Sequence, residues 1–468
     1  MNKQNTNKHT YITEGPIFGS LMKLALPIML SQLMQTLYNL ADTFWVGKVS
    51  ADAIAAITIS FPLVFLMISI AAGLTIAGTA IIAQYKGAGN KQKINHVLGQ
   101  LITYIGSISI IIMIVGIIFS RQMIIWMGAD AGIINDAVAY IRTIFAGMPF
   151  VFGFFIFSSV LRGIGETKTP AVMMFASVLL NIILDPLIIF GIGFLPELGV
   201  QGAAVATIFS RGVVTVLAVY LMIRGIEGLK LELKFMKPDY EIIKMITKVG
   251  IPSSIEQAMI SMGQLVMTKM VAVFGMYTVA AYGVVNRIIS LPVILAFGLA
   301  ASTTTMVGQN IGADKKDRAE KTARISIIII FVALTLIGAL IMINPEFVVG
   351  LFNDKAEVLK DGGDYLLRVA LTFGFIGVMN VANGVFKGAG RTVPPMIISS
   401  TSQWIIRVII GYIFAYYLNL QKIGIWWAIT AANVGGALLG VIWLNSVDWS
   451  TKIIKKKKID MELAVNEE

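Results

Sequence analysis

The chain repeats itself: when its second half is laid over its first, Pro27 falls on Pro252, an offset of 225 positions. The same offset aligns many polar and small residues, among them Lys23 with Lys248, Gln32 with Gln257, Gly73 with Gly298, Gln84 with Gln309, Gly87 with Gly312, Gly163 with Gly388, Gly165 with Gly390, Thr167 with Thr392 and Pro170 with Pro395. In an apolar chain, a duplication of this length predicts two membrane bundles around a shared central space, as in many secondary transporters.

The composition is that of an integral membrane protein. Hydrophobic residues make up 57% of the chain and charged residues 13%, too few to cover the surface of a soluble globule of this size. Runs of about 20 apolar residues recur, and that is the length needed to cross the hydrocarbon core. Cysteine is absent and the only histidines are His9 and His96, so we expect neither disulfides nor a thiolate or histidine metal site.

We predict an all-α integral membrane fold with twelve spans. The spans of the first half are expected at 20–46, 54–85, 95–119, 134–161, 170–190 and 199–223. Those of the second half are expected at 241–272, 278–309, 322–343, 360–386, 394–417 and 425–446. Because each half has an even number of spans, both insert with the same orientation. The two six-helix bundles should therefore be related by a pseudo-two-fold axis along the membrane normal.

Loop charges predict the orientation in the membrane. Lysine and arginine concentrate in the segments on the side of the two termini, whereas the other side holds only Lys48, Arg121, Lys355, Lys360 and Lys422. By the positive-inside rule, both termini are cytoplasmic and the protein lies in the inner (cytoplasmic) membrane. The start of the chain is polar and lacks a signal-peptide core, so we expect the first span to direct insertion.

The sequence divides into four parts: an N-lobe at 1–224, a cytoplasmic linker at 225–240, a C-lobe at 241–447 and a basic cytoplasmic tail at 448–468. The net charge of +11 follows mostly from the cytoplasmic loops and the run Lys455–Lys458. We expect that run to lie against anionic lipid headgroups of the bilayer, with no nucleic-acid partner. We expect a monomer.

No nucleotide-binding motif is present. The nearest look-alike, residues 163–168, has its glycines at the wrong spacing and recurs at 388–392, so it is better interpreted as a tight turn. We therefore predict no enzyme activity and no cofactor. If the protein is a pump, an ion gradient of H⁺ or Na⁺ drives it.

Two aspartates inside predicted spans are the strongest candidates for a functional site, because a charge in the bilayer is energetically costly and an aspartate is too short to reach the interface. Asp42 shares a helix face with Tyr38 and Asn39, and Asp185 shares one with Asn181. Pro186 has no N–H, so it leaves the carbonyl of Ile182 free. These oxygens suit a small metal cation such as Na⁺, bound by Asp42, Asp185 and Asn181, or a proton shared by the two carboxylates.

The second half does not repeat this chemistry. The offset places Met267 opposite Asp42 and Ile410 opposite Asp185, so the first half is the one specialised for ion coupling. The second half offers Glu256 beside Gln257, either for substrate or a second ion, or for a gate-forming hydrogen bond. Basic residues within spans, such as Arg211, are interpreted as structural, several of them reaching the interface. Arg407 lies deeper and is expected to pair between helices.

Several segments together resemble the multidrug and toxic compound extrusion (MATE) family. They are Leu26-Pro27, the run from Gln35 to Gly47, the run from Gln84 to Gly89, the run from Leu161 to Gly165, the run from Asn181 to Pro186 and the run from Gln309 to Gly312. The likeness covers nearly the whole chain, and it is closest to the prokaryotic branch with an aspartate cation site in the N-lobe.

The resemblance implies that Tyr38, Asp42, Asn181 and Asp185 are ion-site residues, with Tyr140 a weaker candidate. Family members also carry an asparagine on span four and a hydroxyl on span six. Here span four offers Ser158 and Ser159, and span six leaves the choice open between Ala203 and Thr207.

The resemblance also implies a secondary active antiporter that exports lipophilic, mostly cationic compounds in exchange for H⁺ or Na⁺. Gln35, Glu256 and Gln257 are candidates for substrate contact or gating, and Pro27 and Pro186 for bending the spans that carry them. A flippase for lipid-linked oligosaccharides and an organic-acid exporter are the alternatives within the superfamily, and both call for a cationic cavity. A passive channel has no need of carboxylates clustered in one lobe.

Overall fold

The computed structural model describes residues 11–193 and 196–454. Within these ranges every regular element is a helix, joined by turns and loops, and the one extended pairing is an isolated β-bridge between Ile226 and Leu229. The run Lys455–Lys458 lies outside the described residues. The first half contains α1 (Tyr11–Glu14), α2 (Ile17–Gly47), α3 (Ala51–Gly87), α4 (Lys91–Trp126), α5 (Ile134–Ala146), α6 (Met148–Ile164), α7 (Lys168–Ile189) and α8 (Gly199–Arg224).

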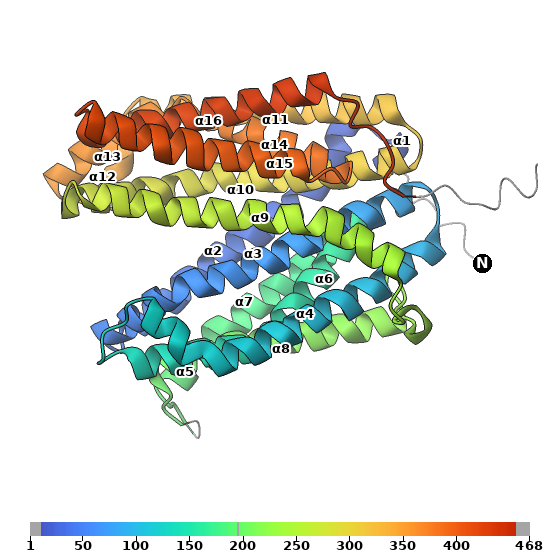
Figure 1. Ribbon diagram of the computed structural model, residues 1–468, viewed down its shortest axis with the longest axis horizontal. Helices are drawn as coiled ribbons and strands as arrows, with labels where there is room; N and C mark the ends of the chain where they lie inside the picture. The colour runs from blue at the N-terminus through green and yellow to red at the C-terminus, as the bar shows by residue number, and fades with distance from the viewer. Residues whose placement is uncertain (1–10, 194–195, 455–468) are drawn as a thin grey trace, which may run out of the picture.

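The second half follows the same order. After a short 3₁₀ turn, η2 (Leu233–Phe235), it contains α9 (Tyr240–Ala272), α10 (Met276–Gly312), α11 (Lys316–Met342), α12 (Pro345–Gly350), α13 (Ala356–Ala370), α14 (Phe373–Gly388), α15 (Val393–Ser400), the π-helices η3 (Thr401–Ile410) and η4 (Ile413–Tyr417), and α16 (Gln421–Ser446). Figure 1 shows two bundles, and residues 11–16 and 447–454 lie at the same end of the molecule. We call this end the terminal face.

The helices supply the twelve predicted spans. Nine spans of the described chain are single helices long and apolar enough to cross a membrane, with α15, η3 and η4 counted as one, and two more are bent helix pairs. The twelfth is α9, whose 33 residues exceed the length of a membrane crossing. Lys244, Lys248 and Glu256 make it less apolar than the others.

Three predicted spans are less regular than a single α-helix. The span expected at 134–161 is bent by 44° between α5 and α6, where Gly147 ends α5 and Pro149 occupies the first turn of α6. The span expected at 360–386 is bent by 52° between α13 and α14. There the hydroxyl of Thr372 donates to the carbonyl of Val369, a local bond that competes with the helical ladder. The span expected at 394–417 is mostly π-helical.

Two helices cross from one lobe to the other at equivalent prolines. The first part of α2, from Ile17 to Ala25, packs in the hydrophobic core of the C-lobe, and beyond Pro27 the helix packs on α7 in the N-lobe. In the same way Ile242, Ile246 and Val249 of α9 pack in the core of the N-lobe, and beyond Pro252 the helix joins the C-lobe. Each lobe therefore receives the first part of the other lobe's first helix.

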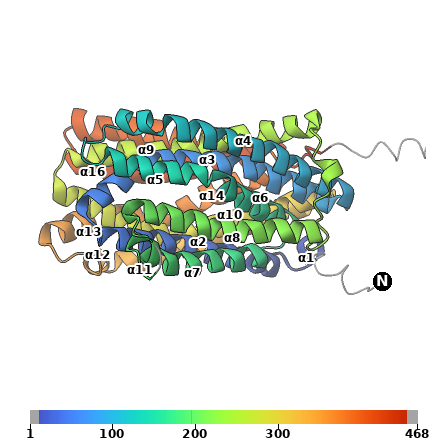
Figure 2. The same ribbon diagram turned by 90° about the horizontal axis from the view of Figure 1, so that it is seen from below.

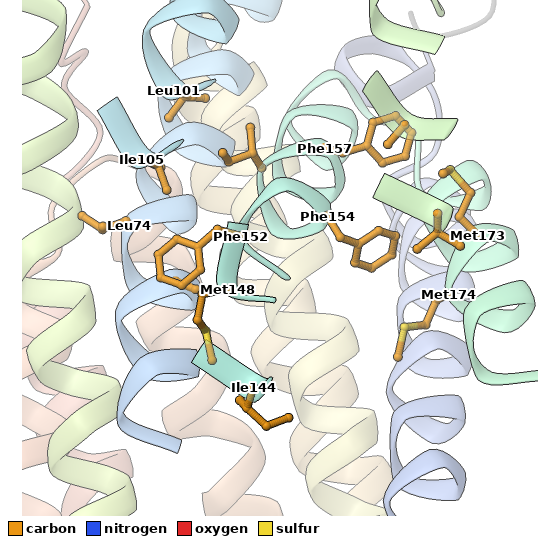
Figure 3. Close-up of a cluster of buried hydrophobic side chains, with 14 of the residues drawn as sticks. Leu74, Leu101, Ile105, Ile144, Met148, Phe152, Phe154, Phe157, Met173 and Met174 are labelled. Atoms are coloured by element: carbon orange, nitrogen blue, oxygen red, sulfur yellow. The ribbon is translucent and has the colours of Figure 1, made fainter. Parts of the chain in front are cut away.

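The core of the N-lobe is built mainly by α3, α4 and α6. Figure 3 shows Phe152 of α6 near Leu74 of α3 and Ile105 of α4, and Figure 2 shows the helices of this lobe from below. All of these side chains are buried. α6 is thus packed between α3, α4 and α8.

The lobes meet through small residues of α3 and α10 at the terminal face. A Cβ on Gly87 would lie 1.9 Å from the carbonyl oxygen of Gln309, and a Cβ on Gly312 would lie 2.0 Å from that of Gln84. The side chains add a second symmetric pair of contacts, because Gln84 donates to the carbonyl of Gly388 (3.2 Å) and Gln309 to that of Gly163 (2.9 Å). Only glycine permits this approach of two backbones.

Equivalent contacts lie deeper in the membrane. A Cβ on Gly73 would lie 2.2 Å from the backbone nitrogen of Ser254, and one on Gly298 would lie 2.3 Å from Met29. Gly73 and Gly87 are fourteen positions apart on one helix, which corresponds to about 21 Å. The lobes are thus in contact over about 21 Å from the terminal face, and their ribbons diverge toward the other end (Figure 1).

The linker is held against α4 rather than free. Gln100 donates to the carbonyls of Phe235 and Lys237 and accepts from the backbone N–H of Asp239. Asp239 in turn caps the start of α9. The polar segment predicted at 225–240 therefore fixes the point at which α9 enters the membrane beside the N-lobe.

Candidate functional site

The two predicted aspartates lie together in the N-lobe. Asp185 of α7 is fully buried, and its Oδ1 accepts a hydrogen bond from Asn181 Nδ2 one turn earlier (3.0 Å). Asp42 lies on the part of α2 that packs on α7, close enough for its charge to act on that of Asp185. The packing of α2 on α7 thus brings both carboxylates to one interface.

Three oxygen atoms at this interface are buried and accept no hydrogen bond from any described residue. They are Asp42 Oδ1, Asn181 Oδ1 and Asp185 Oδ2. An unmatched buried acceptor is energetically unfavourable, and three of them on one interface attract a shared donor or cation. Pro186 follows Asp185 inside α7 and leaves the carbonyl oxygen of Ile182 without its helical donor.

Two tyrosines and a threonine surround the carboxylates. The hydroxyl of Tyr38 lies 2.5 Å from the Oγ1 of Thr207 on α8. Tyr140 of α5 is buried and interacts electrostatically with Asp42, Asp185 and Tyr38. Between the two residues of span six that the sequence left open, the structure therefore brings Thr207 to the site, and no hydrogen bond can come from the methyl group of Ala203.

An arginine that sequence reasoning did not assign to the site lies beside it. Arg211 of α8 donates to Gln35 Oε1 on α2 (2.6 Å), and its guanidinium carbon lies 5.5 Å from the ring centre of Tyr38. Arg211 is near the middle of α8, about 18 Å from each end at 1.5 Å per residue, too far for its side chain to reach an interface. This depth within the span could have been recognised in the sequence as a sign that Arg211 has a partner inside the membrane.

Asn39 does not join the carboxylates. It is exposed, and its side-chain oxygen accepts from Gln35 one turn earlier (3.3 Å). The polar residues of α2 therefore divide between Asp42 and Tyr38, which face the N-lobe, and Asn39, which does not.

The two serines predicted on span four differ in their hydrogen bonds. Ser159 donates to the carbonyl of Ile156 in its own helix, whereas the hydroxyl of Ser158 is buried without a partner among the described residues.

Glu256 belongs to a separate cluster in the C-lobe. It is buried and forms an ion pair with Lys387 of α14 (2.9 Å). Asn383 and Ser399 also donate to its Oε1, both at 3.3 Å. The hydrogen bonds of Glu256 thus run within the C-lobe, and the neighbouring Gln257 is half-buried.

Arg407 of η3 interacts electrostatically with Tyr365 of α13, which is an interhelical contact of the kind expected for it. Its Nη1 donates to Gln403 one turn earlier in η3 (3.1 Å). Its Nε is buried and has no hydrogen-bond partner among the described residues. Arg211 and Arg407 therefore lie in different lobes, and each donates to a glutamine.

The site suits the binding of a small cation. No group of three or more histidine, aspartate or glutamate side chains that could hold a metal occurs in residues 11–193 and 196–454. A cation here would be bound by two carboxylates, an amide oxygen and the free carbonyl of Ile182, all hard oxygen donors. A proton could occupy the same place by neutralising one carboxylate.

Two six-span bundles with crossing helices and a buried acidic site define a polytopic membrane transporter. The MatE family model matches residues 27–187 and 252–413, the two halves of the internal repeat. The chain therefore belongs to the MatE family and is a transporter, not an enzyme.

Several relatives match nearly the whole chain. It is 28% identical over 427 residues to "Probable multidrug resistance protein YoeA" of Bacillus subtilis (strain 168), covering 90% of this chain and 92% of the relative. It is 27% identical over 443 residues to "Probable multidrug resistance protein NorM" of Thermotoga maritima, covering 95% of each. Among solved structures, "Outward-facing conformation of a multidrug resistance MATE family transporter of the MOP superfamily" matches with a TM-score of 0.86 at 28% identity, covering 93% of this chain and 97% of that one.

Proposed function

We propose that this protein is a secondary active antiporter that exports lipophilic, mostly cationic compounds in exchange for H⁺ or Na⁺. The observation that supports ion coupling most directly is the set of three buried acceptor oxygens on Asp42, Asn181 and Asp185, which lack a donor among the described residues. Export of varied compounds is supported by the names of its relatives, several of which are described as multidrug resistance or export proteins.

The course of α2 suggests how ion binding acts on the whole molecule. Its first part is fixed in the core of the C-lobe, and its second part carries Tyr38 and Asp42 against the N-lobe. A cation shared by Asp42 and Asp185 draws the second part of α2 onto α7. The change is taken up where the helical ladder is interrupted, at Pro27 in α2 or Pro186 in α7, and alters the geometry between the lobes.

Antiport then needs no contact between ion and drug. If the cation and the drug prefer different states of one conformational equilibrium, each displaces the other. We propose that the state described here binds the cation from outside and releases the drug outward, since the lobes are in contact at the terminal face. The terminal face is assigned to the cytoplasm of the inner membrane by the distribution of lysine and arginine.

A cationic substrate is favoured over the anionic alternatives by the positions of Arg211 and Arg407. Export of an organic acid, or flipping of a lipid-linked oligosaccharide through its pyrophosphate, calls for basic groups that converge. Arg211 and Arg407 lie in different lobes and are each bound to a glutamine. We propose a monomer as the working unit, because each lobe is completed by the other lobe's first helix.

The test is efflux of ethidium from proteoliposomes under separately imposed pH and sodium gradients. Asp42→Asn keeps the size of the side chain and removes its charge, so we expect it to abolish gradient-driven efflux while the protein remains folded. Asp52→Asn is the matched control, because Asp52 is an exposed residue in the first turn of α3. Efflux by Asp42→Asn at the rate of the control refutes the proposed coupling.

A further inference from the structure

The segment before the first span is packed against both lobes at the terminal face. Ile12 of α1 is fully buried in the hydrophobic cluster of the C-lobe. Its side chain also covers the turn between α6 and α7 of the N-lobe: a Cβ on Gly165 would lie 2.4 Å from Ile12 Cδ1. Gly165 has φ +90, a conformation that glycine adopts readily and that opens the turn to this side chain.

Polar contacts tie the same segment to α10 and α11 of the C-lobe. The carbonyl oxygen of Ile12 accepts from Asn310 (3.5 Å) and Arg318 (3.3 Å), and Arg318 also donates to the carbonyl of Gly15 (2.5 Å). Lys315 forms an ion pair with Glu14 (3.3 Å). Residues 11–16, which we call the N-strap, therefore connect the Gly165 turn of one lobe with two helices of the other.

The segment after the last span makes the reverse connection. Ile453 covers the turn between α14 and α15 of the C-lobe, where a Cβ on Gly390 would lie 2.4 Å from Ile453 Cδ1. Its backbone N–H donates to Gln84 Oε1 of α3 in the N-lobe (3.0 Å), and the next residue, Ile454, is buried in the core of that lobe. We call residues 447–454 the C-strap.

The C-strap is also fixed to its own lobe. Lys452 forms an ion pair with Asp314 (2.6 Å), and Arg391 donates to the hydroxyl of Thr451 (2.6 Å). Trp449 is buried in a third cluster beside α10 and α14. The segment thus starts in the C-lobe and ends in the N-lobe (Figure 1).

The two straps occupy equivalent positions without being repeats of each other. Gly165 and Gly390 correspond under the 225-residue offset, whereas Ile12 and Ile453 belong to opposite ends of the chain. Each turn is held on its inner side by a glutamine from the other lobe, Gln309 or Gln84, and on its outer side by an isoleucine. Two segments that are not repeats of each other therefore cover equivalent glycine turns in the two lobes.

We propose that the two straps are latches that hold the lobes together at the terminal face, and that both must release before this face opens. Opening moves Gly165 away from Asn310 and Arg318, and Gly390 away from Gln84, so neither strap can keep all its contacts. The straps stabilise the state with the terminal face closed, and they set how often the site is exposed on that side. The latches close this face whichever ion is coupled.

The size of the effect follows from the buried isoleucines. Truncating one of them to alanine removes apolar contact area only in the latched state, which changes the equilibrium between closed and open by a factor of about ten or more. Because the straps act on the same equilibrium, the factors multiply when both isoleucines are replaced.

The chain contains no cysteine, so a single introduced thiol reports on the terminal face. Thr305 is fully buried and donates to the carbonyl of Arg162 across the lobes (3.0 Å). In the full chain carrying Thr305→Cys, we expect slow labelling by a membrane-impermeant maleimide added from the terminal side. Adding Ile12→Ala or Ile453→Ala should raise the rate about tenfold, and the pair should raise it further.

Ile343→Ala is the control, because Ile343 is 80% exposed and follows α11 at the other end of the molecule. If Ile12→Ala lowers the yield of folded protein, Asp314→Asn makes the same test at the surface. It removes only the partner of Lys452, keeps a residue suited to the φ of +59, and should raise labelling about twofold to fivefold. Rates equal to that of Ile343→Ala in all these variants overturn the proposal. Loss of ethidium efflux in these variants without a change in labelling also overturns the latch proposal. The ion-coupling proposal is tested separately, by the efflux of Asp42→Asn.

Discussion

Replacing Lys387 with methionine should destabilise the C-lobe much more than replacing Lys387 and Glu256 together. The two side chains form an ion pair at 2.9 Å with exposed fractions of 13% and 2%. Asn383 and Ser399 contribute two further hydrogen bonds to the carboxylate, both at 3.3 Å. Lys387→Met keeps much of the length of the side chain and removes its charge, so Glu256 is left buried with neutral donors only.

The expected magnitude follows from the burial of the pair. Breaking a buried ion pair by removing one partner costs about 3–5 kcal/mol, because the remaining charge is uncompensated. Replacing both partners, as in Glu256→Gln with Lys387→Met, removes that charge and should recover most of the loss. Glu256→Gln alone should have an intermediate effect, because the long side chain of Lys387 can move toward the terminal face.

The assay is the free energy of unfolding in mixed detergent micelles for the wild type, both single variants and the double variant. The coupling between the two sites should be about 2 kcal/mol or more, with the double variant more stable than Lys387→Met. If the two single effects simply add, or if Lys387→Met changes the free energy of unfolding by less than about 0.5 kcal/mol, the pair does not hold the C-lobe together as described.

Two further variants test the interface between the lobes and the site. Gly312→Ala places a Cβ 2.0 Å from the backbone oxygen of Gln84, so we expect loss of ethidium efflux, whereas Gly106→Ala, with no atom within 4 Å, should transport normally; equal rates contradict the close approach of α3 and α10. Thr207→Val removes the 2.5 Å hydrogen bond to Tyr38, which should weaken the apparent affinity for the coupling ion about threefold to tenfold, and an unchanged affinity removes Thr207 from the site.

The fold could be predicted from the internal repeat, because the repeat shows that the two halves of the chain have the same architecture. Aligned prolines, glycines and glutamines implied two equivalent bundles, and the twelve spans follow from their apolar lengths. The breaks within spans could not be predicted. Gly147 with Pro149 is a local signal, but glycine and proline are also common in unbroken membrane helices. The break at Thr372 is accompanied by the hydrogen bond from its hydroxyl to the carbonyl of Val369, and the sequence does not show that this bond forms.

The sequence also did not predict that the first part of α2 packs in the C-lobe and the first part of α9 in the N-lobe. Pro27 and Pro252 mark where α2 and α9 cross, but a periodic apolar face does not say which neighbour it will meet. The core of the C-lobe includes Leu21 and Leu24, and that of the N-lobe includes Ile246. The packing partner is decided by the whole set of helices.

Only the part of the candidate site that lies within single helices could be predicted from the sequence. Asp185 and Asn181 are one turn apart on one helix, so their hydrogen bond follows from helix geometry. Contacts between helices do not: Thr207 and Arg211 reach α2 from α8, and only the fold sets that distance. Asn39 shows the limit of helix spacing, since it lies one turn from Asp42 and still points elsewhere.

The central claim is that Asp42 and Asp185 share one exchangeable cation inside the N-lobe. It is tested most directly by measuring the binding of radioactive sodium and the release of protons on addition of ethidium to the purified protein in weakly buffered detergent. We expect the wild type and Asp52→Asn to show one or both signals, and the double variant Asp42→Asn with Asp185→Asn to show neither. Sodium binding and proton release of wild-type size in the double variant contradict the account.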